Sequence, residues 1–306
     1  MDTQHRTVPL PGTSLSYHVT EPSADGTPVV FLHPWFGCWQ FWTSTMERLA
    51  GRPCYAVDLY SPAAGEWSAD AGPAALADAV VAMLDAEGLD RVDVVGNSVG
   101  GIVAQVIAST VPHRVRRLVL VGTGASTEGA LPGFARAVDR WIAVGRDGGA
   151  ASRAAAEDTI GMLFTGRPDA PTWETYVQAV LRTDPAYLAA VLGAARRLDL
   201  RPRLERITAP TLVVRGSEDC ARTAEHAAVL AAGIPTARSV EMPGAGHSPM
   251  VDQSARFADL VASHLDEDVP HPTASSETAA WASASATSPG SATCTRPAGC
   301  ATTRSS

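Results

Sequence analysis

The chain has 306 residues, 45% of them hydrophobic and 18% charged, which is enough apolar material for one sizeable core. Its net charge of -8 and its pI near 5.5 argue against a nucleic-acid-binding surface, which needs clustered positive charge, so we expect a small-molecule substrate as partner. All 24 basic residues are arginines, and the absence of lysine excludes Schiff-base chemistry, pyridoxal phosphate attachment and a phosphate-loop lysine.

The sequence carries no targeting or membrane signal that we can identify. The N-terminal stretch MDTQHRTVPLPG lacks the basic region and apolar core of a secretory signal, and no run of 18 or more apolar residues follows. The cysteines, at positions 38, 54, 220, 294 and 300, are odd in number and lack metal-type pairing. We therefore expect a cytoplasmic protein with no membrane contact, no disulfide framework and no zinc site.

Short apolar runs alternate with longer, alanine- and leucine-rich segments along most of the chain. The runs have the length and continuity of strands that are buried on both faces. The segments 72–88 and 99–112 between them have a helical period. This alternation predicts an α/β fold with a mostly parallel central sheet flanked by helices. The predicted strands are Pro28–His33, Cys54–Leu59, Val92–Asn97, Arg117–Gly122, Pro210–Gly216 and Ala237–Met242.

Two stretches depart from the alternation. From Thr123 to about Ile207 several helical patterns follow one another without a convincing strand, which indicates a helical insertion over one end of the sheet. From Asp266 onward Ser, Thr, Ala, Pro and Gly dominate, and few aliphatic residues remain to build a core. We expect a core formed by 1–123 and 201–265, an inserted helical cap at 124–200 and a disordered tail at 266–306.

The pentapeptide GNSVG, at 96–100, places a serine between a predicted strand and a predicted helix. In this context G-x-S-x-G is typical of a tight turn that presents a nucleophilic serine at the edge of a sheet. Gly96 and Gly100 let strand and helix approach closely, and the amide of Val99 points from a helix N-terminus toward a developing oxyanion. Ser98 is therefore the candidate nucleophile, and a glycine–serine turn without chemistry is the alternative.

A serine nucleophile needs a base and a carboxylate that orients the base. Asp219 lies three residues after Gly216, where a predicted strand ends, and His247 lies in a glycine-rich loop after another predicted strand. Like Ser98, both are therefore expected at strand ends. Glu218 is a neighbouring carboxylate, but the spacing from the strand favours Asp219.

The order Ser98, Asp219, His247 resembles that of the α/β-hydrolase superfamily, and the resemblance extends over residues 10–265. The segment RPRLERITAPTLVVRGSED is similar to the one that returns the chain from the cap to the acid-bearing strand of that family. A serine at position 98 disfavours the family's dehalogenases and epoxide hydrolases, which carry a carboxylate there. The resemblance implies acyl transfer through an acyl-enzyme, with no metal or organic cofactor.

The segment FLHPWFGCWQFW is similar to the family's oxyanion loop, usually H-G-x-P-G. The resemblance implies that His33 hydrogen-bonds within this loop and that the backbone amide of Trp35, together with that of Val99, binds the oxyanion. Pro34 stands where the family usually has glycine, and Phe36 where it usually has proline. The backbone path of the loop is therefore open.

Apolar side chains in the predicted cap indicate an apolar substrate pocket. We expect hydrolysis of a carboxylic ester or lactone with an apolar acyl part. A carbon–carbon bond hydrolase, a lyase or ring-forming enzyme, and a ligand-binding protein without turnover remain alternatives. The candidate pocket residues are His33, Phe36, Trp39, Trp141, Met162 and Phe164.

Overall fold

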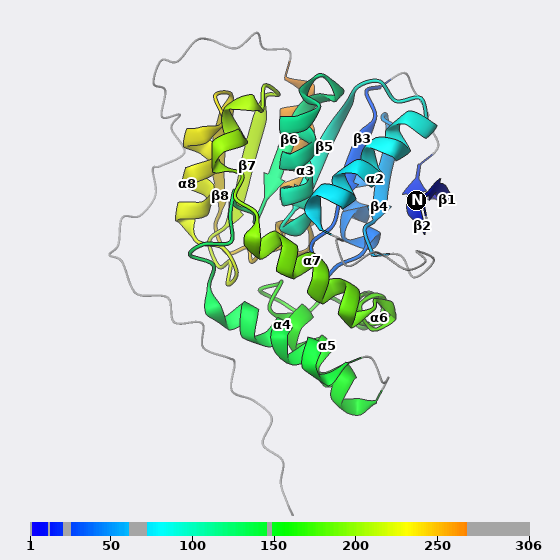
Figure 1. Cartoon of the computed structure of the whole chain (residues 1–306), viewed down its shortest axis with the longest axis vertical. Coiled ribbons are helices and arrows are strands. Elements are labelled where there is room, and N and C mark those ends of the chain that lie inside the picture. The colour runs from blue at the N-terminus through cyan, green and yellow to red at the C-terminus, as the bar shows by residue number, and fades with distance from the viewer. Residues whose placement is uncertain (1, 12, 21–25, 61–71, 146–148, 268–306) are drawn as a thin grey trace, which may run out of the picture. The chain divides into compact units, whose positions relative to one another are not determined.

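In a computed structural model, residues 2–11, 13–20, 26–60, 72–145 and 149–267 are described, so the predicted tail lies outside the described residues from position 268 onward. These residues form an eight-stranded sheet in the order β1-β2-β4-β3-β5-β6-β7-β8 (Figure 1). Strand β2 is antiparallel to both β1 and β4, and the other neighbouring pairs are parallel. The strands are β1 (Gln4–Leu10), β2 (Thr13–Val19), β3 (Val29–Leu32), β4 (Cys54–Asp58), β5 (Val92–Asn97), β6 (Val115–Val121), β7 (Thr211–Gly216) and β8 (Ala237–Met242).

The parallel part of the sheet confirms the predicted fold class. Strands β3 and β5 are buried along their whole length, which is why they read as continuous apolar runs in the sequence. The hairpin of β1 and β2 was not predicted. Strand β1 lies at the edge of the sheet and exposes most of its residues, so it carries no apolar pattern.

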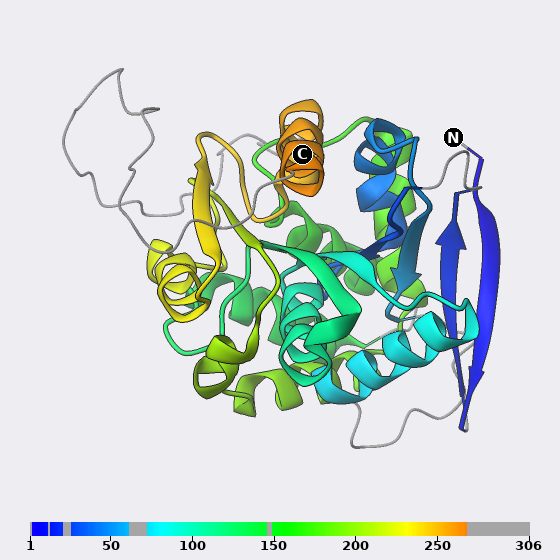
Figure 2. The ribbon, with the colours of Figure 1, turned by 90° about the horizontal axis from the view of Figure 1, so that it is seen from above.

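Helices cover both faces of the sheet. In Figure 2, α1 and α10 lie on one face, and α2, α3 and α8 lie on the other. None of the described helices is long and apolar enough to cross a bilayer. The core helices are α1 (Thr43–Arg48), α2 (Pro73–Ala86), α3 (Val99–Thr110), α8 (Ala224–Gly233), α9 (Pro249–Asp252) and α10 (Ser254–Asp266), with short 3₁₀ turns η1 (Trp39–Trp42), η2 (Pro112–Arg114) and η3 (Arg201–Arg206).

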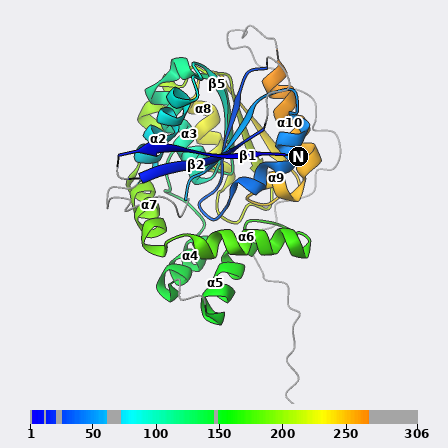
Figure 3. The same ribbon diagram turned by 90° about the vertical axis from the view of Figure 1, so that its right-hand side faces the viewer.

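In the described residues between β6 and β7, where a cap was predicted, four α-helices gather beside the carboxyl ends of the parallel strands (Figures 1 and 3). We call residues 124–200 the cap. Two cap helices begin at an aspartate N-cap: the side chain of Asp169 accepts the N–H of Thr172, and the side chain of Asp184 accepts that of Ala186. A proline lies in the first turn of both helices, where its missing N–H costs no hydrogen bond. The cap helices are α4 (Pro132–Val144), α5 (Ala150–Gly161), α6 (Ala170–Arg182) and α7 (Pro185–Arg197).

A buried ion cluster binds the C-terminal end of α10 near the amino-terminal ends of the parallel strands, away from the cap. Asp93, fully buried at the start of β5, pairs with Arg116 at 2.6 Å and with Arg52 at 3.4 Å. Both arginines also donate to the carbonyl oxygen of Leu265, in the last turn of α10. Beyond this turn Glu267 pairs with Arg238.

Candidate active site

Ser98 lies between β5 and α3 in a strained backbone conformation, with φ 54° and ψ -116°. Among the described residues it is the one non-glycine residue with a positive φ. Such a conformation costs about 1–3 kcal/mol and persists where the surroundings enforce it. The end of β6 and the residues just after it do so here, because the Ser98 N–H donates to Val121 O at 2.9 Å and the Ser98 carbonyl accepts from Thr123 Oγ1 at 2.8 Å.

The two glycines of the pentapeptide allow the backbone to pack at distances that a side chain would prevent. A Cβ at Gly96 would lie 2.4 Å from the carbonyl oxygen of Gly100. A Cβ at Gly100 would lie 2.2 Å from Leu32 O and 2.7 Å from His33 O. The first turn of α3 therefore rests directly on the end of β3, where the predicted oxyanion loop begins.

Asp219 and His247, predicted from separate loops, meet in the structure. The Nδ1 atom of His247 lies 2.9 and 3.0 Å from the two carboxylate oxygens of Asp219. The N–H groups of Ala221 and Arg222 also donate to Asp219 Oδ1, at 2.8 and 2.9 Å. The neighbouring Glu218 is exposed and accepts from the hydroxyl of Ser217, so it does not compete for His247.

The Asp219–His247 pair is shielded from solvent, with both side chains fully buried. Burial alone would raise the pKa of Asp219, but the charge of His247 and the hydrogen bonds from His247, Ala221 and Arg222 lower the pKa below its usual value. The carboxylate therefore stays ionised and fixes the proton of His247 on Nδ1. Within the described part of the chain, Nε2 of His247 is buried without a hydrogen-bond partner, so this nitrogen is available to accept a proton.

The predicted oxyanion loop is braced by His33. Leu59 N donates to His33 Nε2 at 3.0 Å, so Nδ1 carries the proton and donates to Pro34 O at 2.7 Å. Burial lowers the pKa of His33 to about 4, and the ring stays neutral. Because both ring nitrogens bind main chain, His33 holds the loop and does not offer a free polar atom to a substrate.

The cap contacts this loop directly. Trp35 Nε1 donates to Leu188 O in α7 at 3.0 Å, and the hydroxyl of Tyr187 donates to Leu59 O at 3.2 Å. Val99 is the first residue of α3, so its N–H has no partner within the helix. Trp35 follows the end of β3 and Val99 follows the end of β5, so both residues whose amides are predicted to bind an oxyanion lie beyond the carboxyl ends of neighbouring parallel strands.

Four of the six predicted pocket residues, the phenylalanines and tryptophans, make aromatic contacts in three different places. Phe36 and Trp141 are buried and pack edge to face, with ring centroids 5.1 Å apart. Phe164 packs on Phe41 and Tyr176, inside the apolar contact between the cap and η1. Trp39 stacks instead on His18 of β2, at 4.2 Å, and so packs against the hairpin that the sequence did not predict.

Met162 and Phe134 border the start of α4. The methyl group of Met162 lies 3.7 Å from the point where a Cβ on Gly133 would stand. Phe134, the next residue, packs on the ring of His247 with centroids 5.8 Å apart. Phe134 belongs to the predicted cap, but no pattern in the sequence indicates that it contacts His247.

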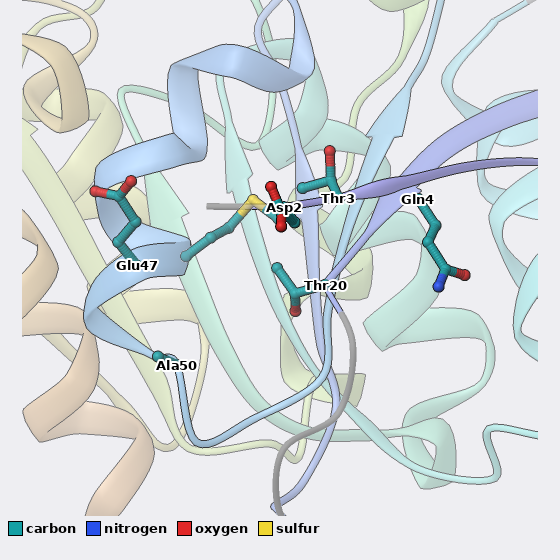
Figure 4. Close-up of a pocket in the computed structure, with 7 residues that line it drawn as sticks. Asp2, Thr3, Gln4, Thr20, Glu47 and Ala50 are labelled. Carbon is teal, nitrogen blue, oxygen red and sulfur yellow. The ribbon is translucent and has the colours of Figure 1, made fainter.

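Two surface hollows lie away from the triad residues. One, of about 480 Å³, opens between β1, the end of β2 and α1, and Asp2, Gln4 and Glu47 lie on its wall (Figure 4). The other, of about 260 Å³, lies between residues 125–129 and the first turns of α8. Neither is lined by Ser98 or His247.

Comparisons with known proteins agree with this architecture. The model of the alpha/beta hydrolase family matches residues 29–260. Pimeloyl-[acyl-carrier protein] methyl ester esterase of Chromobacterium violaceum is 29% identical over 267 residues, covering 80% of this chain and 97% of that protein. 2-Hydroxymuconate semialdehyde hydrolase of Pseudomonas sp. is 30% identical over 264 residues, covering 80% and 89%. The crystal structure of the esterase RhEst1 from Rhodococcus sp. superposes with a TM-score of 0.75 at 26% identity, covering 87% and 98%. The family match spans most of the chain and the fold agrees with it, so this protein is a hydrolase that belongs to the alpha/beta hydrolase family.

Proposed function

We propose that this hydrolase uses Ser98 as nucleophile, His247 as general base and Asp219 as the group that orients the base. One observation carries the proposal: a strained serine at a strand-to-helix turn lies at the same sheet edge as a buried Asp219–His247 hydrogen bond. A hydrogen bond connects the serine turn with the loop of His247: Asn97, the residue before Ser98, donates from Nδ2 to the carbonyl oxygen of His247 at 3.1 Å.

The chemistry that follows is a two-step acyl transfer. His247 Nε2 takes the hydroxyl proton of Ser98 while Ser98 Oγ bonds to the carbonyl carbon of the substrate. The backbone amides of Val99 and Trp35 stabilise the oxyanion that forms. The bond to the leaving group breaks as His247 returns the proton to the departing oxygen. Water then adds to the acyl-enzyme, again giving a proton to His247, and the carboxylic acid leaves with Ser98 restored. No metal or organic cofactor is required.

We propose a carboxylic ester or lactone with a neutral, apolar acyl part as the substrate class. Phe134, Phe36 and Trp141 form an aromatic border around the base and the oxyanion loop, and burial of ligand surface against it is worth about 25 cal/mol per Å². Three cap arginines could in principle pair with a charged acyl chain, and none of them is buried beside His247. Arg136 and Arg140 are exposed, and Arg153 pairs with Glu174 and Glu157.

The experiment is a p-nitrophenyl ester series from acetate to decanoate with a succinate half-ester. We expect burst release, a kcat/KM maximum at a medium chain length and the lowest value for the charged half-ester. A fluorophosphonate should add once, at Ser98. Ser98→Ala should lose about 10⁴- to 10⁶-fold in rate and Asp219→Asn about 10⁴-fold, whereas Glu218→Gln should resemble the parent. Labelling of another serine would contradict the assignment.

Carbon–carbon bond hydrolysis is the second candidate, because one similar protein is named as a 2-hydroxymuconate semialdehyde hydrolase. The same triad residues would serve water-dependent cleavage of a vinylogous diketone. A kcat/KM for such a diketone well above that for every ester in the series would favour this reaction. Tight binding of a ligand that Ser98→Ala leaves unchanged, without turnover of any substrate, would indicate a binding protein instead.

A further inference from the structure

Asn97, the last residue of β5, is fully buried directly before the candidate nucleophile. Its carboxamide makes three hydrogen bonds. Nδ2 donates to Val121 O at 2.9 Å and to His247 O at 3.1 Å, and Oδ1 accepts from Ser248 Oγ at 3.0 Å. Both amide hydrogens are therefore used, and two of the three bonds reach the loop that carries His247.

These contacts complement the bond made by Asp219. Asp219 holds the imidazole of His247 through Nδ1, which fixes the plane and the tautomer of the ring. It does not fix the main chain from which that ring projects. Asn97 binds this loop at the carbonyl oxygen of His247 and at the side chain of Ser248. These bonds restrain the distance between the main chain of His247 and the end of β5.

The cap holds the other side of the same loop. The N–H of Ser248 donates to Leu163 O in the connection between α5 and α6, at 3.0 Å. The loop thus lies between the sheet, through Asn97, and the cap, through Leu163. Loss of the Asn97 side chain would remove the Nδ2 donor from the buried carbonyl oxygens of Val121 and His247. The loop would then be free to move toward the cap.

We propose that Asn97 is a positioning residue for His247, holding the base loop against the end of β5 so that Nε2 stays within reach of Ser98. The role rests on the proposed function of Ser98 and His247. A displacement of about 1 Å in such a constellation costs about 10²-fold in rate. The effect belongs to the chemical step, because Asn97 is not placed where it would touch a substrate.

The test compares Asn97→Ala with a matched variant, Gln105→Ala. Gln105 is also a fully buried amide, and its Nε2 donates to two carbonyls, Gly101 O and Gly124 O, but it does not contact the base loop. For Asn97→Ala we expect kcat to fall 10- to 100-fold with KM within about twofold, and the rate of fluorophosphonate inactivation to fall by a similar factor. Gln105→Ala should lose comparable thermal stability with a kcat near that of the parent. Equal losses of kcat in the two variants, or a change in KM alone, would overturn the proposal.

A spectroscopic readout makes the test independent of turnover. The downfield proton resonance of His247 Nδ1–H, hydrogen-bonded to Asp219, should shift or broaden in Asn97→Ala and remain unchanged in Gln105→Ala. A parent that neither hydrolyses esters nor reacts with fluorophosphonate would contradict the proposed function, whereas an unshifted resonance in Asn97→Ala would contradict the positioning role.

A second variant keeps the test available if Asn97→Ala does not fold. Ser248→Ala removes one of the three bonds and should lower kcat about threefold or more, with the same shift of the His247 resonance. Parent values of both quantities would overturn the proposal.

Discussion

The ring of Phe134 in the first turn of α4 lies 5.8 Å from the ring of His247, measured between centroids. Two turns further along the same helix, Trp141 packs edge to face on Phe36 of the predicted oxyanion loop. A single cap helix therefore spans the site from the base to the loop that would bind the oxyanion. Because α4 contacts both His247 and Phe36, we expect changes in α4 to alter specificity as well as stability.

Phe134→Ala should lower kcat/KM for medium-length acyl esters about tenfold and have little effect on the acetate ester. The reason is the loss of apolar contact worth about 1.4 kcal/mol, which only a longer acyl chain would use. Leu131→Ala is the control, because Leu131 directly precedes α4 and is exposed. Equal losses across all chain lengths would mean that Phe134 acts on His247 and not on the substrate.

Gly100→Ala should damage both folding and chemistry. Its Cβ would lie 2.2 Å from Leu32 O, so α3 and the end of β3 must separate, at a cost of about 1–3 kcal/mol in unfolding free energy. Because the predicted oxyanion loop begins at His33, we expect kcat to fall about 10²-fold. Gly51→Ala is the matched control, since a Cβ there meets no atom within 4 Å. Urea unfolding and steady-state kinetics of both variants test this, and a Gly100→Ala variant with parent kcat would refute the close-packing argument.

The sequence predicted Ser98, Asp219 and His247 because each follows a strand in a locally recognisable motif. It did not predict that Asn97 reaches His247, because these residues lie 150 positions apart and only the folded sheet edge joins them. Trp39 illustrates the opposite case. Its partner, His18, belongs to a hairpin whose exposed strand carries no apolar period, so nothing in the sequence indicated this stacking contact.

His264 should make the protein less stable in mild acid. Burial, with the charges of Arg238 and Arg117, lowers the pKa of His264 to about 4 in the folded state, whereas an unfolded histidine titrates near 6.5. Between these values the unfolded chain binds more protons, so stability is lost as the pH falls from about 6.5 toward 4. At pH 5 the loss should be about 1–2 kcal/mol for this residue.

The measurement is urea unfolding of the parent and His264→Gln at pH 7.5 and pH 5. Glutamine keeps a donor for Pro210 O, which His264 Nε2 approaches to 3.2 Å, but cannot become charged. His33, whose pKa is also lowered by burial, is present in both proteins and its contribution cancels. Parallel losses of unfolding free energy in the two proteins would assign the acid sensitivity to other groups.

Asp252, the last residue of α9, bridges the base loop and the cap. Its Oδ2 accepts the N–H of Gly246 at 2.7 Å, and its Oδ1 accepts the N–H of Thr165 at 2.9 Å. Together with the Ser248–Leu163 bond, this fastens the cap segment 163–165 to the loop that carries His247. Movement of this segment should therefore be transmitted to the base.

Asp252→Ala should lower kcat about three- to tenfold and speed amide hydrogen exchange at Gly246 and Thr165, because both N–H groups lose their acceptor. Asp252→Asn should give a smaller effect, since its single carbonyl oxygen can still accept from one of the two. Asp259→Ala is the control, because Asp259 forms an exposed pair with Arg48, and such pairs contribute about 0–1 kcal/mol. If exchange accelerates in Asp252→Ala while kcat stays at the parent value, the cap segment moves independently of His247, and the bridge serves stability alone.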